Sequence, residues 1–275
     1  MIIKMDQYRV VGNPIAHSKS PHIHMHFAKN TNRQMNYVYL VGDLETFEQQ
    51  VKDFFNEGGK GMNVTAPFKE RAFALCTNLS GRAQKAGAVN TLKQNLDGTF
   101  FGDTTDGIGM VHDIKINNQQ ILKGKRILIV GAGGAVRGVL ESLFAEQPQE
   151  MVIANRTLSK AQTLVDLFAD AAVPFSAVSF ADISGQFDLI INATSASISG
   201  ASLPIPDAVI GANTWCYDMM YSKDSTIFLE WAKRLGAQGS DGLGMLVEQA
   251  AESFALWHGI RPNTDELMRE MRAAL

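Results

Sequence analysis

A glycine-rich turn after an apolar run is the first feature of the sequence that could perform binding chemistry. Residues 126–130 are mostly apolar, and five small residues follow them: Gly131, Ala132, Gly133, Gly134 and Ala135. Gly131 permits a tight turn, Gly133 lets the backbone approach a pyrophosphate, and a helix that begins near Gly134 points free N–H groups at that anion. An ordinary strand-to-helix turn is the alternative, since such turns often use glycine for a positive φ. With the flanking pattern, the sequence predicts a dinucleotide site.

The residues after the next apolar run indicate which dinucleotide is bound. Residues 151–154 are apolar, and Asn155 and Arg156 follow, with Asn155 standing 24 positions after Gly131. NAD-binding chains place an acid near this position, where it holds the ribose 2′-hydroxyl. An acid would repel a 2′-phosphate, whereas a guanidinium can bind it through two parallel hydrogen bonds. Arg156 alone could be a solvated surface charge, but in this context we predict NADP(H) as the cofactor.

Two serines beside a proline suggest a receptor for a carboxylate. Ser18, Ser20 and Pro21 lie close together, and the pattern predicts a helix with Ser20 as its N-cap and Pro21 at its first position. Two hydroxyls at the positive end of a helix dipole form a small, neutral anion site. An ordinary cap explains Ser20 and Pro21 equally well but leaves Ser18 unexplained.

Lys69 is the candidate for proton transfer. Asn63 and Thr65 alternate along a predicted strand end, and Pro67 is expected to begin the next helix, which places Lys69 in its first turn. A cation is disfavoured there by the helix dipole, which hints at a chemical role. A lysine near an acid and a bound carbonyl can exchange the proton that accompanies hydride transfer. The alternative is a solvated surface lysine.

Asn90 and Asp106 are the other polar candidates. Asn90 lies within a predicted strand, and Asp106 precedes the helix that opens the second half of the chain. Helix capping alone could account for Asp106.

Composition excludes several classes of function. The 275 residues carry a net charge of −3, so we expect no nucleic-acid partner, and no stretch reaches the ~20 apolar residues of a membrane span. Cys76 and Cys216 are the only cysteines, which favours reduced thiols. We therefore expect a soluble, cytoplasmic protein. Residues 17–26 hold four histidines, but only His22 and His26 share a helical face and no other ligand is close in sequence, so we expect no metal.

Strands and helices alternate along the chain, which predicts two α/β domains with a cleft between them and a mostly parallel, doubly wound sheet in the second. A hairpin is expected at residues 88–102, around Leu96-Asp97-Gly98. The expected domains are residues 1–106, completed by the C-terminal helices 243–275, and residues 107–242. The expected strands are 8–11, 37–41, 61–65, 88–94, 99–102, 127–130, 151–154, 175–178, 189–192 and 215–218.

In these segments the chain resembles the shikimate/quinate dehydrogenase family over nearly its whole length. The resemblance lies in motifs that occur in the family's order: residues 12–21, 63–69, 87–91, 102–107, 131–135, 155–157, 192–195, 217–219 and 241–246. It implies an N-terminal substrate-binding domain, a Rossmann-like nucleotide-binding domain and NADP-dependent reduction of 3-dehydroshikimate to shikimate in aromatic amino-acid biosynthesis. A quinate-accepting enzyme and a non-catalytic NADPH-binding regulator are the alternatives, and the chain could be a monomer or a homodimer.

The resemblance also implies residue roles. Lys69 and Asp106 match the family's catalytic pair. The implied substrate contacts are Ser18, Ser20, Thr65, Asn90, Tyr221 and Gln249. The implied cofactor contacts are Gly131, Ala132, Gly133, Gly134, Ala135, Asn155, Arg156, Thr157, Lys160, Thr194, Met219, Gly242 and Met245. The chain departs from the family pattern at Ala66, Gly81 and Val136, which puts affinity in question more than reaction type.

Overall fold

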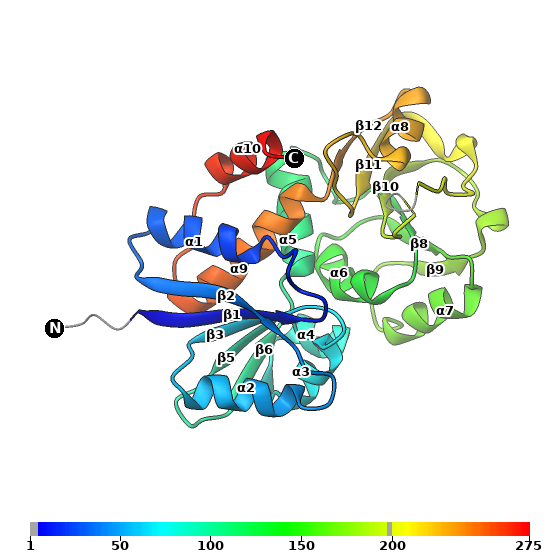
Figure 1. Cartoon of the computed structure of the whole chain (residues 1–275). Coiled ribbons are helices and arrows are strands. Elements are labelled where there is room, and N and C mark those ends of the chain that lie inside the picture. The colour runs from blue at the N-terminus through cyan, green and yellow to red at the C-terminus, as the bar shows by residue number, and fades with distance from the viewer. Residues whose placement is uncertain (1–4, 197–199) are drawn as a thin grey trace. The chain divides into compact units, whose positions relative to one another are not determined.

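The computed structural model describes residues 5–196 and 200–275, and the chain forms two compact units (Figure 1). The first unit runs to Gly109 and includes Val247–Arg269. The second comprises Met110–Leu246 and Glu270–Leu275. No helix in the described part of the chain is long and apolar enough to cross a membrane.

The first unit is built on a mixed six-stranded sheet in the order β2-β1-β3-β5-β6-β4. Strands β1, β2 and β3 are parallel, whereas β5 runs antiparallel to both β3 and β6 and forms the expected hairpin. The strands are β1 (Asp6–Gly12), β2 (Met35–Val41), β3 (Gly61–Val64), β4 (Asn78–Leu79), β5 (Thr91–Gln94) and β6 (Phe100–Asp103). The helices are α1 (Ser20–Asn30), α2 (Phe47–Asn56), α3 (Lys69–Leu75), α4 (Gly81–Ala86), and parts of α5 (Asp106–His112), α9 (Leu243–His258) and α10 (Asp265–Ala273).

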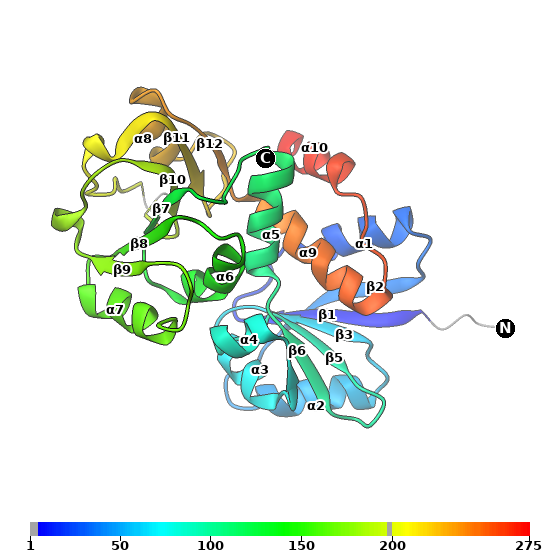
Figure 2. The ribbon, with the colours of Figure 1, turned by 180° about the vertical axis from the view of Figure 1, so that it is seen from behind.

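Both faces of this sheet are covered. Helices α2, α3 and α4 pack against one face (Figure 2). Phe47 and Phe68 stack on this face with ring centroids 4.5 Å apart. Helices α1 and α9 cover the other face, where His24 of α1 stacks on Tyr37 at 4.3 Å and lies near Trp257. Burial of apolar side chains on both faces holds α1 and α9 to the strands that carry the site.

His24 makes this core sensitive to acid. Burial, and secondarily the charge of His258, lowers the pKa of His24 to about 3. His24 therefore takes up a proton near pH 6.5 in the unfolded chain but only near pH 3 in the folded chain. The contribution of neutral, buried His24 to the free energy of unfolding is complete above pH 6.5 and is lost as pH falls toward 3. The free energy of unfolding of the wild type should fall between pH 7 and pH 5, and we expect this fall to be roughly 2 kcal/mol smaller in His24→Phe. Urea unfolding at the two pH values measures this, and equal decreases in both proteins would contradict it.

The second unit is a fully parallel six-stranded sheet in the order β9-β8-β7-β10-β11-β12. In chain order this is 3-2-1-4-5-6, the order of dinucleotide-binding sheets, and the strand order reverses between β7 and β10. The strands are β7 (Arg126–Val130), β8 (Glu150–Ala154), β9 (Phe175–Val178), β10 (Phe187–Asn192), β11 (Ile210–Asp218) and β12 (Gln238–Asp241). The α-helices are α6 (Gly134–Ala145), α7 (Leu158–Leu167) and α8 (Ile227–Arg234), and shorter helical turns lie at Asp113–Asn117, Phe180–Asp182 and Asp207–Val209.

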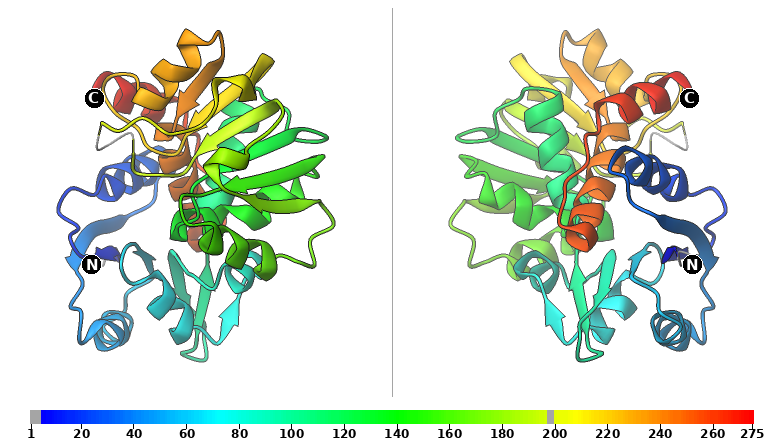
Figure 3. Two further views of the ribbon diagram at one scale, coloured as in Figure 1. Left: turned by 90° about the vertical axis from the view of Figure 1, so that its right-hand side faces the viewer. Right: turned by 90° about the vertical axis from the view of Figure 1, so that its left-hand side faces the viewer.

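Alternate residues of β7 and β8 enter two separate cores, which is why these two strands are almost continuously apolar. Ile127 and Ile129 pack with α6 and α7 on one face, whereas Leu128 and Val130 pack with α8 on the other. Figure 3 shows helices on both sides of this sheet. The doubly wound architecture expected from the alternating pattern is confirmed.

Two helix starts differ from expectation. Helix α1 begins at Ser20 itself, because the Lys19 carbonyl accepts the first helical bond from Ile23 at 3.1 Å. Helix α3 begins at Lys69 rather than Pro67, because Phe68 N–H donates to the Thr65 carbonyl at 3.0 Å and closes a turn that contains the proline. The strand expected at 88–94 is also shorter and begins at Thr91.

Candidate active site

Lys69 and Asp106 form an ion pair that joins the starts of two helices. No other lysine–aspartate ion pair in the described part of the first unit joins two helix starts. Lys69 is the first residue of α3 and Asp106 is the first residue of α5. The Lys69 Nζ donates to Asp106 Oδ2 at 2.5 Å, and both side chains keep some exposure to solvent. Since an ammonium at a helix N-terminus opposes the dipole, the carboxylate compensates for its position. The result is a proton donor held by a base and accessible from outside.

Asn90 fixes the second oxygen of Asp106. Its Nδ2 donates to Asp106 Oδ1 at 2.9 Å, so the two carboxylate oxygens have different partners. Its own Oδ1 accepts from Thr91 Oγ1 at 2.8 Å and from the Thr105 backbone N–H at 3.0 Å. These bonds determine which end of the buried amide faces Asp106. Asn90 therefore orients the acid of the pair.

A hydrogen-bonded network behind Asn90 connects β3, β5 and α9. Ser253 Oγ lies 2.7 Å from Thr91 Oγ1 and 3.2 Å from Thr105 Oγ1, and it accepts from Asn63 Nδ2 at 3.0 Å. Thr105 Oγ1 also lies 3.4 Å from Gln249 Oε1, which brings the predicted Gln249 to the same network. Buried polar groups joined in this way restrict one another's orientation. Sequence reasoning missed Ser253 and Thr105, and no local signal in the sequence marks Ser253.

The serines of the predicted carboxylate site lie at the start of α1. Ser18 Oγ accepts the Ser20 backbone N–H at 3.3 Å, so Ser18 has a structural role that the sequence did not reveal. Tyr37 stacks on His24 of α1, with ring centroids 4.3 Å apart, and donates to Asn63 Oδ1 at 2.7 Å. Burial raises the pKa of Tyr37 well above its ordinary value, which keeps it a donor. Helix α1 is thus connected to the network around Asn90.

Thr65 follows β3 and is held by its backbone. Its N–H donates to the Val11 carbonyl at 2.9 Å, and its methyl group lies against the backbone of Gly12. A Cβ added at Gly12 would come within 2.4 Å of that methyl, so glycine is required for this approach. Thr65, Asn90, Lys69, Asp106 and Gln249 all lie in the first unit.

The glycine turn of the second unit has the geometry of an anion site. Gly131 has a φ of +111°, which favours glycine, and it connects β7 to the turn before α6. A Cβ added at Gly133 or Gly134 would meet nothing within 4 Å, so the backbone is open to a ligand. The N-cap Gly133 offers α6 no side-chain oxygen. Val136, where the family pattern prefers a smaller residue, is fully buried in the core beneath.

Arg156 lies exposed directly beyond the end of β8. Among the described residues it has no acidic partner, and Asn155 beside it donates from Nδ2 to the Thr157 carbonyl at 2.8 Å. Thr157 is the N-cap of α7 and uses no side-chain cap bond, and Lys160 is exposed one turn further on. Positive and polar groups therefore gather at the carboxyl end of β8, where a ribose phosphate would be expected.

The remaining predicted cofactor residues lie at the carboxyl ends of β10, β11 and β12. Thr194 is held by Asn192, whose Oδ1 accepts its N–H at 3.0 Å and its hydroxyl at 2.8 Å. A Cβ at Gly242 would come within 2.3 Å of the Met219 carbonyl, so only glycine fits there. Met245 packs on the core beside them, and Tyr221 is half-buried, with its pKa raised by burial and by Asp241.

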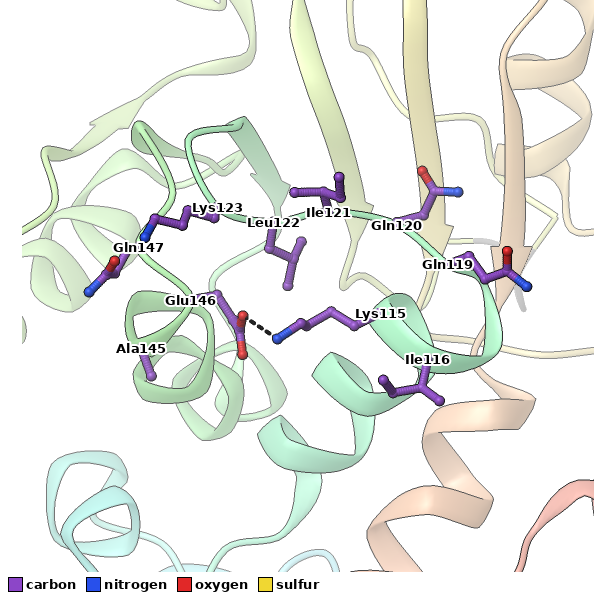
Figure 4. A pocket seen from close by; sticks show the side chains of 10 residues that line it. All are labelled: Lys115, Ile116, Gln119, Gln120, Ile121, Leu122, Lys123, Ala145, Glu146 and Gln147. Atoms are coloured by element: carbon purple, nitrogen blue, oxygen red, sulfur yellow. Dashed lines mark ion pairs between the residues drawn. The ribbon is translucent and has the colours of Figure 1, made fainter.

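A hollow in the second unit lies away from the predicted cofactor residues. Lys115 and Glu146 form an ion pair of 2.7 Å across it, and the loop before β7 forms its wall (Figure 4). It lies toward the amino ends of the strands, whereas ligands of such sheets bind at the carboxyl ends. Among the described residues, no group of three histidine, cysteine or acidic side chains could hold a metal ion.

Three family models match the chain. Residues 10–92 match the shikimate dehydrogenase substrate binding domain, and residues 114–199 match the shikimate/quinate 5-dehydrogenase model. Residues 242–272 match the shikimate 5′-dehydrogenase C-terminal domain.

Individual proteins agree with these models. A shikimate dehydrogenase (NADP(+)) of Hahella chejuensis is 53% identical over 98% of this chain and 99% of its own. Among solved structures, an Ael1 enzyme from Pseudomonas putida matches with a TM-score of 0.91 and 45% identity, over 96% of this chain and 97% of that one. A shikimate 5-dehydrogenase from Thermus thermophilus, in complex with NADP(H) and shikimate, matches with a TM-score of 0.86 and 32% identity, over 98% of this chain and 100% of that one.

Proposed function

Because this chain belongs to the shikimate dehydrogenase family, we propose that it reduces 3-dehydroshikimate reversibly to shikimate with NADPH. The observation that carries the proposal is the Lys69–Asp106 pair, oriented by Asn90. Reduction of a ring carbonyl needs one hydride and one proton, and this pair supplies the proton. A non-catalytic NADPH-binding protein would have no need of it.

Lys69 performs the proton transfer in this proposal. NADPH supplies the hydride that the carbonyl carbon accepts. Negative charge then develops on the carbonyl oxygen, where the Lys69 ammonium stabilises it and donates the proton. Asp106 holds the ammonium in place at 2.5 Å and can accept a hydrogen bond from a substrate hydroxyl. In the direction of oxidation, the neutral lysine takes the proton back.

The polar residues of the first unit bind the substrate in this proposal. Ser18 and Ser20 hold the carboxylate at the start of α1, where hydroxyls and the helix dipole favour an anion. Asn90 and Gln249, which are linked through Thr105, are the proposed contacts to the ring hydroxyls. The further proposed substrate contacts are Thr65 and Tyr221.

The second unit binds NADP(H) in this proposal, and its residues fit that group. The backbone N–H groups of the open glycine turn would donate to the pyrophosphate, and the Arg156 guanidinium would donate to the 2′-phosphate. The further proposed contacts lie at the ends of β8, β10, β11 and β12: Asn155, Thr157, Lys160, Thr194, Met219, Gly242 and Met245. We propose a cytoplasmic location, because Cys76 and Cys216 are both free thiols, as is usual in a reducing compartment.

Steady-state assays test the proposal directly. We expect oxidation of shikimate with NADP⁺ to be much faster than oxidation of quinate or any reaction with NAD⁺. Equal activity with quinate would make the chain a broader shikimate/quinate dehydrogenase. No activity with either acid, in a protein that binds NADPH, would favour the regulator.

Replacement of the serines should affect binding more than chemistry. Ser18→Ala and Ser20→Ala each remove a hydroxyl that contacts the carboxylate equally in the ground and transition states, so KM for shikimate should rise by roughly tenfold while kcat changes little. Initial rates over a range of shikimate concentrations measure both constants. A fall in kcat with an unchanged KM would place the serines in the chemical step instead.

A further inference from the structure

The last turn of helix α10 holds an arginine that binds an acid at the end of β12. Arg272 donates from one terminal nitrogen to Asp241 Oδ2 at 2.8 Å and from the other to Asp241 Oδ1, so the two groups meet through two parallel hydrogen bonds. The side chain of Arg272 is 46% exposed, whereas that of Asp241 is 7% exposed. The ion pair therefore joins a surface cation to a buried anion, and both residues belong to the second unit.

Asp241 is fixed to the turn that begins α9. Its Oδ1 accepts the Leu243 backbone N–H at 3.2 Å, and the Gly242 N–H donates to the Met220 carbonyl at 3.0 Å. An anion is favourable at a helix N-terminus, so this position suits the carboxylate even apart from its arginine. The negative charge of Asp241 thus lies one residue from Gly242, which is a proposed cofactor contact.

A second buried acid lies against the same turn. Asp113 Oδ2 accepts the Tyr217 hydroxyl at 2.7 Å, and a Cβ added at Gly244 would come within 2.0 Å of Asp113 Oδ1. The hydrogen bonds to Asp241 raise the pKa of Arg272, burial opposes this, and the charge of Asp113 adds to the increase. The guanidinium of Arg272 therefore interacts electrostatically with both acids.

The proposed function brings the nicotinamide end of the cofactor to this side of the sheet. A dinucleotide spans the point where the strand order reverses, with one nucleotide over each half of the sheet. The 2′-phosphate is assigned to Arg156 beyond β8, so the nicotinamide half belongs over the ends of β10, β11 and β12. The nicotinamide ring is positively charged in NADP⁺ and neutral in NADPH, whereas the phosphates are the same in both. A fixed charge near Gly242 therefore changes the ratio of the two affinities.

We propose that Arg272 neutralises the charge of Asp241 and so prevents the second unit from binding NADP⁺ more tightly than NADPH. This inference rests on the proposed function. Arg272 acts through Asp241 and needs no contact with the cofactor. Without the guanidinium, the carboxylate would attract the positive ring of NADP⁺ and leave the affinity for the neutral ring of NADPH nearly unchanged. NADP⁺ is the product of the reduction, so the ion pair favours its release.

The affinities of the full chain for the two cofactor forms test this inference. Titration of NADPH fluorescence gives one Kd, and displacement of NADPH by NADP⁺ gives the other, both at about 50 mM salt to limit screening. We expect Arg272→Gln to lower the ratio of Kd for NADP⁺ to Kd for NADPH by about three- to tenfold, the effect of one partly screened charge. Arg269→Gln removes an exposed arginine one turn earlier in α10 and should leave the ratio unchanged.

Two variants of Asp241 separate charge from structure. Asp241→Asn leaves the arginine without its acid, so the ratio should rise, by less than Arg272→Gln lowers it, because the exposed arginine is screened more. The double variant Asp241→Asn/Arg272→Gln removes both charges and should return the ratio toward the wild-type value. Circular dichroism confirms that each protein is folded.

The outcomes distinguish this inference from the proposed function. An unchanged ratio in Arg272→Gln, or single variants that shift the ratio in the same direction, would overturn the role of Arg272. A double variant that differs from the wild type as much as Arg272→Gln would do the same, because a lost contact rather than a lost charge would then be the cause. A wild type that binds neither NADPH nor NADP⁺ would overturn the proposed function and this inference with it.

Discussion

Lys69→Ala should lower kcat for shikimate oxidation by about 10²–10⁴-fold, with a much smaller change in KM. The ammonium touches the reacting oxygen, where charge changes most between the ground state and the transition state. Its removal therefore reduces stabilisation of the transition state more than binding of the substrate. Initial rates of NADP⁺ reduction at saturating shikimate, on protein shown to be folded by circular dichroism, measure the effect.

Two variants make this result interpretable. Lys60→Ala removes an exposed lysine before β3 and should leave kcat unchanged. Asp106→Asn keeps an oxygen near Asn90 and Lys69 but removes the negative charge, so its loss should be smaller if Asp106 mainly orients the lysine. A Lys69→Ala enzyme with nearly normal kcat would exclude lysine as the proton donor. It would leave Asp106, or a bound water, to carry the proton.

The second unit was predictable from the sequence because its signals are local. A buried parallel strand is a continuous apolar run, and the glycine turn follows the first such run directly. The expected strands at 151–154 and 175–178 match β8 and β9 within a residue. Strand β12 escaped prediction because Gln238–Asp241 is polar and has no apolar pattern.

The site of the first unit was predictable only in part, because its contacts join distant segments. Lys69 and Asp106 are 37 residues apart, and only the resemblance to a family paired them. Ser253 lies 162 residues from Thr91, and an isolated serine in an apolar helix gives no sign of such a contact. The helix start expected at Pro67 was wrong for a local reason, since proline also fits the turn that closes between Thr65 and Phe68.

Arg156→Ala should raise KM for NADP⁺ by roughly 10- to 150-fold while KM for NAD⁺ changes little. Only NADP⁺ carries the 2′-phosphate, and Arg156 is exposed at the end of β8 without an acidic partner among the described residues, so its guanidinium is available for that phosphate. A charge-assisted pair of this kind contributes to cofactor binding and not to the chemical step, so kcat at saturating NADP⁺ should remain near the wild-type value.

The role of Arg156 is decided by comparing how much Arg156→Ala changes KM for NADP⁺ with how much it changes KM for NAD⁺. Arg269→Ala, which removes an exposed arginine of α10, is the control for a general loss of positive charge and should change neither KM. Raising the ionic strength should weaken NADP⁺ binding in the wild type and have less effect in Arg156→Ala, because the screened interaction is then already absent. Equal losses with NADP⁺ and NAD⁺ would mean that Arg156 supports the fold of the β8–α7 turn. Cofactor choice would then rest on Lys160 or on the backbone of the same turn.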